Sequence, residues 1–242
     1  MIYAIGDIHG DLSKLRAAQD RVARDAGGRP HDVVHVGDLV DRGPDSRGVI
    51  AHLMAGQAAG RPWRVLKGNH DRMMTEFIRH GRRDPRLRPD WDWLAPPLGA
   101  AETLVSYGAD IAGLAAAAAR EAALAAVPGA HLDWLESLPA FHAAERFFFC
   151  HAGVAPGVAL ADQVEDDLIW VRAPFDVDPV LHPKVVVHGH VPVGAVTHYG
   201  GRINIDTGCA YGGPLSVIVC DDETGQTWEV TAKGRRVLAP PI

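Results

Sequence analysis

Three short, mainly apolar segments in the first third of the chain are each followed by a polar cluster and then by an amphipathic stretch. They lie at residues 2–5, 33–36 and 63–66. Such runs indicate buried strands, and the stretches after them carry apolar side chains at helical spacing. Three successive strand–loop–helix units predict right-handed crossovers and therefore a largely parallel sheet layered by helices.

The later part of the chain carries more short apolar runs, at residues 147–150, 185–187, 203–205, 215–220 and 227–231. The last two flank a turn and predict an antiparallel hairpin. We expect no helix among these late runs, so they should form a second sheet packed on the first. The predicted fold class is α/β, with two mixed β-sheets packed as a sandwich and flanked by helices.

The region between these two parts departs from the strand–helix rhythm. Residues 82–91 are basic, contain proline and carry a tryptophan, whereas the alanine-rich residues 111–127 favour helix. We interpret residues 82–140 as a helical insertion within one domain that spans residues 1–242, a length that suits a single core. The arginine and tryptophan side chains of 82–91 either contact a substrate or form a solvated loop, and the sequence leaves both readings open.

Charge and cysteine content narrow the choice of partners. The formal net charge is −6, which argues against nucleic acid or a membrane as a partner, because anionic phosphates are bound by clustered lysine and arginine. The three cysteines form no close pair, which favours a reducing compartment. The sequence shows neither a basic leader nor an apolar stretch of about 20 residues. We expect a soluble, cytoplasmic protein.

Polar side chains that can bind metals or protons recur just past the ends of the predicted strands. They are Asp7, His9, Asp38, Asp41, Arg42, Asn69, His70, His151, His188 and His190. Each alone would more often be a turn or core residue, but open α/β sheets bind ligands at this edge. Mixed oxygen and nitrogen ligands without thiolate suit Mn, Fe or Zn. Even six ligands from this set would be more than one tetrahedral site uses, so we predict two ions that share a bridging carboxylate.

The motifs that carry these residues resemble those of the calcineurin-like metallophosphoesterases. In chain order they are GDIHG at 6–10, GDLVDRG at 37–43, GNHD at 68–71, HAG at 151–153 and GH at 189–190. The resemblance extends from residue 1 to about 214 and is weakest at 82–138. Within the superfamily, the motifs are most similar to the phosphoprotein phosphatase branch, especially the bacterial and bacteriophage lambda-type serine/threonine protein phosphatases.

The resemblance implies two divalent metal ions, with Mn as the first choice and Fe or Zn as alternatives. It assigns the ligands by motif position: Asp7, His9 and Asp38 for the first ion, and Asp38, Asn69, His151 and His190 for the second. His188 lies two residues before the last ligand, and we favour a supporting role for it. Asp71 stands where many eukaryotic relatives have glutamate, and no role is assigned to it.

The resemblance also implies a reaction. A hydroxide that bridges the two ions would attack the phosphorus directly, and His70, oriented by Asp41, would protonate the leaving alkoxide. Arg42 and Arg172 match arginines that hold phosphoryl oxygens, and Asn69 is counted with them as substrate-binding. The implied enzyme is a phosphoric monoester hydrolase, a serine/threonine protein phosphatase, whose partner is a phosphorylated protein or peptide, or a small phosphoester.

Two alternatives to the protein phosphatase remain. A symmetrical diadenosine tetraphosphate hydrolase is supported by HAGV at 151–154 and DTGC at 206–209. Against it stands Asp41, a carboxylate that we expect those hydrolases to lack, since a pyrophosphate leaves without a strongly oriented acid. A binding module without turnover is disfavoured, because every expected metal ligand is present.

Overall fold

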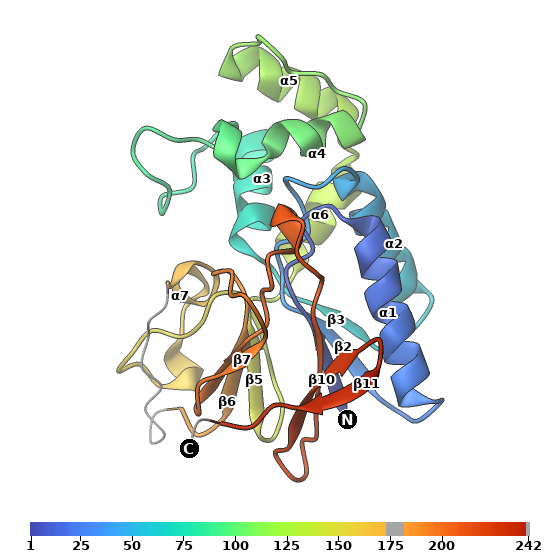
Figure 1. Cartoon of the computed structure of the whole chain (residues 1–242). Helices are drawn as coiled ribbons and strands as arrows, with labels where there is room; N and C mark the ends of the chain where they lie inside the picture. Colours follow the sequence, from blue (N-terminus) through green and yellow to red (C-terminus); the bar gives the residue numbers. More distant parts are fainter. Residues whose placement is uncertain (173–181, 241–242) are drawn as a thin grey trace.

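The computed structural model describes residues 1–172 and 182–240 and confirms the predicted class, two mixed sheets flanked by helices. The first sheet has the order β11-β10-β9-β1-β2-β3 and the second the order β4-β5-β6-β8-β7 (Figure 1). The strands of the first sheet are β1 (Ile2–Ile5), β2 (Asp32–His35), β3 (Trp63–Val65), β9 (Val217–Cys220), β10 (Thr227–Thr231) and β11 (Gly234–Val237). Those of the second are β4 (Phe141–Ala143), β5 (Phe147–Cys150), β6 (Val185–His188), β7 (Thr197–His198) and β8 (Arg202–Asn204).

The three strand–loop–helix units are confirmed. β1, β2 and β3 run parallel and are followed by α1 (Leu12–Ala26), α2 (Ser46–Ala58) and α3 (Asn69–His80). The Asp45 side chain caps α2 by accepting a hydrogen bond from the backbone N–H of Gly48 at 2.8 Å. α3 ends at Gly81, whose φ of 64° is a left-handed conformation that glycine adopts without strain. The expected terminal hairpin is formed by β9 and β10, which pair antiparallel.

Successive side chains of a strand point to opposite faces of the sheet, so the buried apolar side chains form two clusters. Ile2 and Ala4 of β1 belong to the apolar cluster between the two sheets, whereas Tyr3 and Ile5 belong to the cluster beneath the helices. In the second sheet, Phe147 likewise joins the cluster between the sheets. Full burial of a side chain such as Ile5 contributes roughly 1.5–3 kcal/mol, so the strands, and with them the loops at their carboxyl ends, are held firmly.

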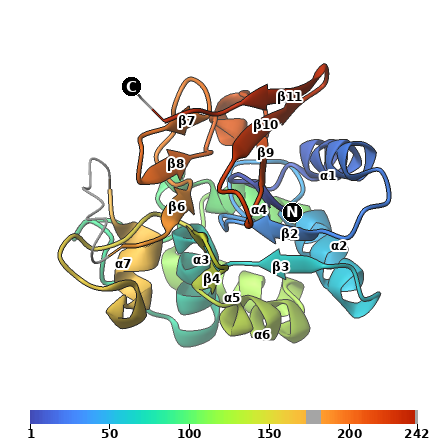
Figure 2. The same ribbon diagram turned by 90° about the horizontal axis from the view of Figure 1, so that it is seen from below.

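The short elements were harder to foresee than the long ones. The expectation of no helix among the late strands is wrong, because α7 (Glu165–Trp170) lies between β5 and β6. Its six residues are too few to show a helical period, and its first turn consists of Glu165, Asp166 and Asp167. The strands β4, β7 and β11 were also not predicted from the sequence. Figure 2 places α7 and the α1–α2 pair on opposite sides of the molecule, beside different sheets.

Residues 82–140 lie at one end of the molecule (Figure 1). They form the short 3-10 helix η1 (Pro96–Leu98) and the helices α4 (Ala100–Ser106), α5 (Ala116–Ala126) and α6 (Gly129–Ser137). α4 contacts α2, while α5 and α6 contact α3. Trp93 and Leu104 are buried in the same apolar cluster as the helices of the first sheet. The region therefore packs against the core through Trp93, Leu104 and the contacts of its helices with α2 and α3.

Among the helices of residues 1–172 and 182–240, none has the length and apolar character needed to cross a lipid bilayer.

Candidate metal centre

Loops at the carboxyl ends of five strands bring the predicted site residues to one place. β1, β2 and β3 end on this side in the first sheet, and the parallel strands β5 and β6 end there in the second. The predicted residues that line a shared cavity of about 500 Å³ are His9, Asp38, Arg42, Asn69, His70, Arg172 and His190. Asp7, Asp41 and His151 are buried directly behind them. The cavity therefore opens between the two sheets, at the edge where α/β folds bind ligands.

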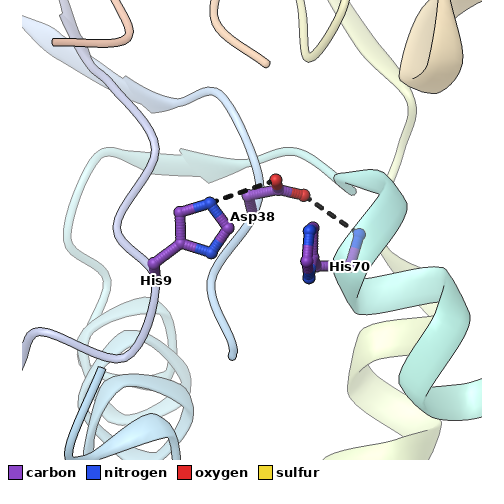
Figure 3. Close-up of side chains that lie close together, drawn as sticks. All are labelled: His9, Asp38 and His70. Atoms are coloured by element: carbon purple, nitrogen blue, oxygen red, sulfur yellow. Dashed lines mark hydrogen bonds and ion pairs between the residues drawn. The ribbon is translucent and has the colours of Figure 1, made fainter. Parts of the chain in front are cut away.

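Asp38 lies at the centre of the site. Its Oδ2 is 3.4 Å from His9 Nε2, and its Oδ1 is 3.3 Å from His151 Nε2. The backbone N–H of His70 donates a hydrogen bond to Oδ1 at 3.0 Å (Figure 3). One carboxylate thus presents its two oxygens to imidazoles that come from different sheets.

Two groups of ligand atoms share this carboxylate. One group consists of His9, Asp38 and His70, the other of Asp38, His151 and His190, and within each group the ligand atoms lie within 4.8 Å of one another. Asn69 joins the second group, because its Oδ1 is 2.9 Å from His151 Nε2. His70 Nδ1 is engaged by Asp41, which leaves only Nε2 for any contact with a metal or a substrate.

Asp7 reaches the site from β1 but lies outside both groups. Its Oδ2 accepts a hydrogen bond from the backbone N–H of His190 at 2.9 Å. Its Oδ1 and the Nε2 of His190 are buried and have no hydrogen-bond partner among the described residues. Gly189 lies so close that a Cβ there would overlap the Asp7 carboxylate. Buried lone pairs without a donor are costly, and divalent cations would supply a partner for each, so the residues fit the predicted metals.

The charges of the site also suit a cation. Burial lowers the pKa of His9 to about 3 and also lowers those of His151 and His190, so these imidazoles are neutral at pH 7, the form that binds metals. Burial raises the pKa of Asp7, and the nearby Asp206 and Asp38 raise it further. Burial alone would raise the pKa of Asp38, but the imidazole groups around it hold that pKa well below its usual range.

Asp41 and His70 form a buried pair beside the metal ligands. Their side chains meet at 2.7 Å between His70 Nδ1 and Asp41 Oδ2, and Asp41 is fully buried. Two further side chains donate to the same carboxylate: Trp93 Nε1 to Oδ2 and Thr103 Oγ1 to Oδ1, each at 2.8 Å. The pair was proposed from the sequence, but the roles of Trp93 and Thr103 were not, because a lone tryptophan and a lone threonine carry no recognisable signal.

The backbone of the site is strained. Within residues 1–172 and 182–240, five residues other than glycine have φ between 46° and 73°, namely His9, Asp38, Asp41, Arg42 and His190. Residues with a Cβ rarely adopt this conformation, which costs of order 1–3 kcal/mol each. Such residues gather where the surrounding structure fixes them for function.

Arginine and aromatic side chains surround the cavity beyond the ligands. Arg42 Nη1 is 2.7 Å from His9 Nε2, and its guanidinium lies 5.4 Å from the ring centroid of Tyr211. The lining also includes Arg172 and three side chains of the segment whose role the sequence left open, Arg86, Arg88 and Trp91. Arg88 stacks over the ring of Trp91 at 5.1 Å.

Three polar residues near the site have other surroundings. His188 is fully buried, and its Nε2 is 3.2 Å from Arg202 Nη1, which suits the supporting role favoured for it. Asp206, to which no role was assigned from the sequence, lines the cavity, and burial raises its pKa to about 6. Asp71 accepts hydrogen bonds from the backbone N–H groups of Leu39 and Gly68, at 2.9 and 2.8 Å.

Asp71→Ala should destabilise the fold. The substitution leaves two buried N–H groups without an acceptor, at about 1–3 kcal/mol each, and it frees the loop after β2 from the start of α3. We expect a loss of about 2–5 kcal/mol in the free energy of unfolding, measured by urea denaturation. Asp71→Asn keeps one carbonyl acceptor and should lose less. Equal stability of Asp71→Ala and the parent chain would contradict this role.

The sequence was found to be similar to one protein family and to several curated proteins. The family model described as calcineurin-like phosphoesterase matches residues 1–220. A symmetrical bis(5'-nucleosyl)-tetraphosphatase of Paracidovorax citrulli is 31% identical over 195 residues, which is 79% of this chain and 57% of that protein. Serine/threonine-protein phosphatase 2 of Escherichia coli is 34% identical over 93 residues, which is 38% of this chain and 39% of that protein.

A solved structure shares the fold. The crystal structure of a putative diadenosine tetraphosphatase superposes with a TM-score of 0.62 at 21% identity, over 95% of this chain and 92% of that one. The chain spans little more than half the length of the Paracidovorax citrulli relative and two fifths of the Escherichia coli one.

Proposed function

Because this chain belongs to the calcineurin-like phosphoesterase family, a family of metal-dependent phosphoesterases, we propose that it hydrolyses dinucleoside polyphosphates such as diadenosine tetraphosphate. The observation that carries the proposal is the lining of the cavity. Arg42, Arg86, Arg88 and Arg172 lie around it together with the rings of Trp91 and Tyr211. A substrate with several phosphates and a flat base at each end would use both kinds of group.

The comparisons support the same substrate class. Similarity to the symmetrical tetraphosphatase extends over 195 residues, whereas similarity to the serine/threonine phosphatase extends over 93. The longer match includes regions beyond the shared metal-binding motifs of the first half. Substrate choice depends on such regions, because the metal ligands alone serve any phosphate.

Different residues have different roles in the proposed reaction. Divalent ions held by Asp7, His9, Asp38, Asn69, His151 and His190 would supply the nucleophile by acidifying water and would offset phosphate charge. Arg42 and Arg172 bind phosphoryl oxygens, where planar guanidinium groups can give paired hydrogen bonds. In this proposal, Nε2 of His70 donates a proton to the departing oxygen. Asp41 fixes the imidazole by accepting from Nδ1.

One observation favours a second candidate, a phosphatase for phosphoserine or phosphothreonine in proteins. The Asp41–His70 pair is short and buried. A nucleoside diphosphate leaves as a stable anion, but an alkyl alkoxide must be protonated as it leaves, so an oriented acid contributes much more to the second reaction. The open rim of the cavity, with Tyr211 68% exposed, is compatible with a peptide.

Side-by-side rates distinguish the two candidates. With Mn present, we expect kcat/KM for diadenosine tetraphosphate to exceed that for a phosphoserine peptide by at least about tenfold, which corresponds to 1.4 kcal/mol of transition-state binding. Chromatography of the products should show two ADP molecules if cleavage is symmetrical, and AMP with ATP if it is not. A preference for the peptide would support the protein phosphatase, and para-nitrophenyl phosphate serves as the common reference substrate.

A further inference from the structure

Asp41 and Arg42 form a strained corner that residues 82–106 hold in place. Both have φ above 70°, a conformation unfavourable for side chains with a Cβ. The backbone N–H of Arg42 donates to the carbonyl of Gly99 at 3.2 Å. Gly99 itself approaches so closely that a Cβ there would overlap the Arg42 backbone. The corner therefore depends on a segment that lies more than 50 residues away along the chain.

The carboxylate of Asp41 is fully buried and receives three donors. His70 Nδ1 and Trp93 Nε1 both donate to Oδ2, and Thr103 Oγ1 donates to Oδ1. An ionised carboxylate in such surroundings is stable only when donors replace the lost water. Because Trp93 and Thr103 donate from fixed positions, they also set the plane of the carboxylate.

The hydroxyl groups beneath Asp41 form a consistent network. The backbone N–H of Asp41 points to Ser46 Oγ at 3.1 Å and to Thr103 Oγ1 at 2.8 Å, and the two hydroxyl oxygens are 2.9 Å apart. Since Thr103 donates its own proton to Oδ1, Ser46 must donate to Thr103. Ser46, Thr103, Trp93 and Asp41 are all buried, so water does not compete for these bonds.

We propose that Trp93 and Thr103 are positioning residues, which keep Asp41 Oδ2 on His70 Nδ1 and thereby aim His70 Nε2 at the leaving oxygen. In the step concerned, the bond from phosphorus to the leaving oxygen breaks, and its electron pair stays on that oxygen. The oxygen takes the proton from Nε2, which leaves His70 neutral. The oxygen of a water molecule forms the new bond to phosphorus, and the proton that this water loses passes to solvent. The inference rests on the proposed phosphohydrolase function and assigns part of its apparatus to residues 82–106.

Trp93→Phe and Thr103→Val test the proposal, since each removes one donor. Thr103→Val nearly conserves the shape of the side chain, whereas Trp93→Phe also leaves a void in the core. We expect kcat/KM to fall by about tenfold or more for an alkyl phosphate and by less than about threefold for para-nitrophenyl phosphate, whose leaving group needs no proton. Thr103→Ser restores a hydroxyl and should recover the parent ratio between the two substrates. Equal losses on both substrates, or none, would overturn the positioning role.

Matched controls separate this effect from a loss of stability. Trp134→Phe removes an indole hydrogen bond to Gln57 of 2.9 Å, and Thr227→Val removes a buried hydroxyl bond to the Leu238 carbonyl of 2.9 Å. Both controls lie outside the cavity, so they should leave the ratio between the substrates unchanged. Thermal melting of each variant reports the stability.

A proton NMR measurement tests the geometry without turnover. The His70 Nδ1–H held by Asp41 should give a downfield signal that Asp41→Asn removes and that Trp93→Phe shifts. An identical signal in Trp93→Phe and the parent chain would overturn the inference. If the parent chain hydrolysed no phosphate compound, the proposed function would fail, but this signal would still decide whether Trp93 and Thr103 position His70.

Discussion

Asp38→Asn should lower kcat/KM by at least about 10³-fold for every phosphate substrate. Asp38 is the one residue that belongs to both groups of metal ligands, and its two oxygens face His9 and His151. An amide keeps one weak oxygen donor and loses the negative charge, so both ions should bind poorly. Loss of a single group that stabilises transition-state charge already costs about 10²–10³. Steady-state kinetics with Mn added, before and after chelation, measures the effect.

The matched control is Asp32→Asn. Asp32 begins β2, the strand that Asp38 follows, and it forms an exposed ion pair with Arg64 of 3.7 Å. Such pairs contribute about 0–1 kcal/mol, so this variant should keep its activity. Calorimetric titration should show two Mn ions per parent chain and fewer for Asp38→Asn. Full activity of the Asp38 variant, or an unchanged Mn stoichiometry, would contradict the two-metal centre.

Asp41→Asn should change the reaction selectively. Without the carboxylate, His70 loses its orientation and the charge that stabilises its protonated form, so an alkyl phosphate should lose about 10²–10⁴ in kcat/KM, the range of general acid catalysis. An aryl phosphate should lose about tenfold or less, because a phenolate leaves without a proton. Rates on a phosphoserine peptide and on para-nitrophenyl phosphate, measured on one preparation, give the ratio directly.

Asp45→Asn is the control for this substitution. Asp45 caps α2 through a hydrogen bond from the N–H of Gly48, and asparagine caps helices as well as aspartate does. The control should therefore keep both rates. If Asp41→Asn lowered the two rates equally, His70 would have no special role at the leaving oxygen, and the case for an alkyl ester substrate would lose its main support.

That the proposed metal ligands meet at one edge could be predicted, because each follows a strand whose apolar run is visible in the sequence. Parallel strands align their carboxyl ends, so a local motif such as GNHD at 68–71 is placed by topology alone. The contacts of Trp93 and Thr103 with Asp41 could not be predicted. They span 52 and 62 residues and depend on how residues 82–106 pack, which no periodicity encodes.

The substrate class could not be predicted from the sequence, because it too depends on how residues 82–106 pack. The sequence-based preference for a protein phosphatase relied on Asp41, whose proposed role concerns only the leaving group. The cavity wall farther from the proposed metal ligands includes Arg86, Arg88 and Trp91, from a segment that could equally have been a solvated loop. That segment is held near the site by the ion pair of Asp84 with Arg72 of α3 and by burial of Leu87 in the core.

The left-handed backbone conformation at His9, Asp38 and His190 would make the stability of the site depend on bound metal ions. Strain stored in a loop lowers the free-energy difference between its closed and open forms. A ligand that binds only the closed form raises that free energy. The supply of metal ions would thus affect the resistance of the chain to proteases as well as its catalytic rate. A cell that withholds the ions would shorten the protein's lifetime along with its activity.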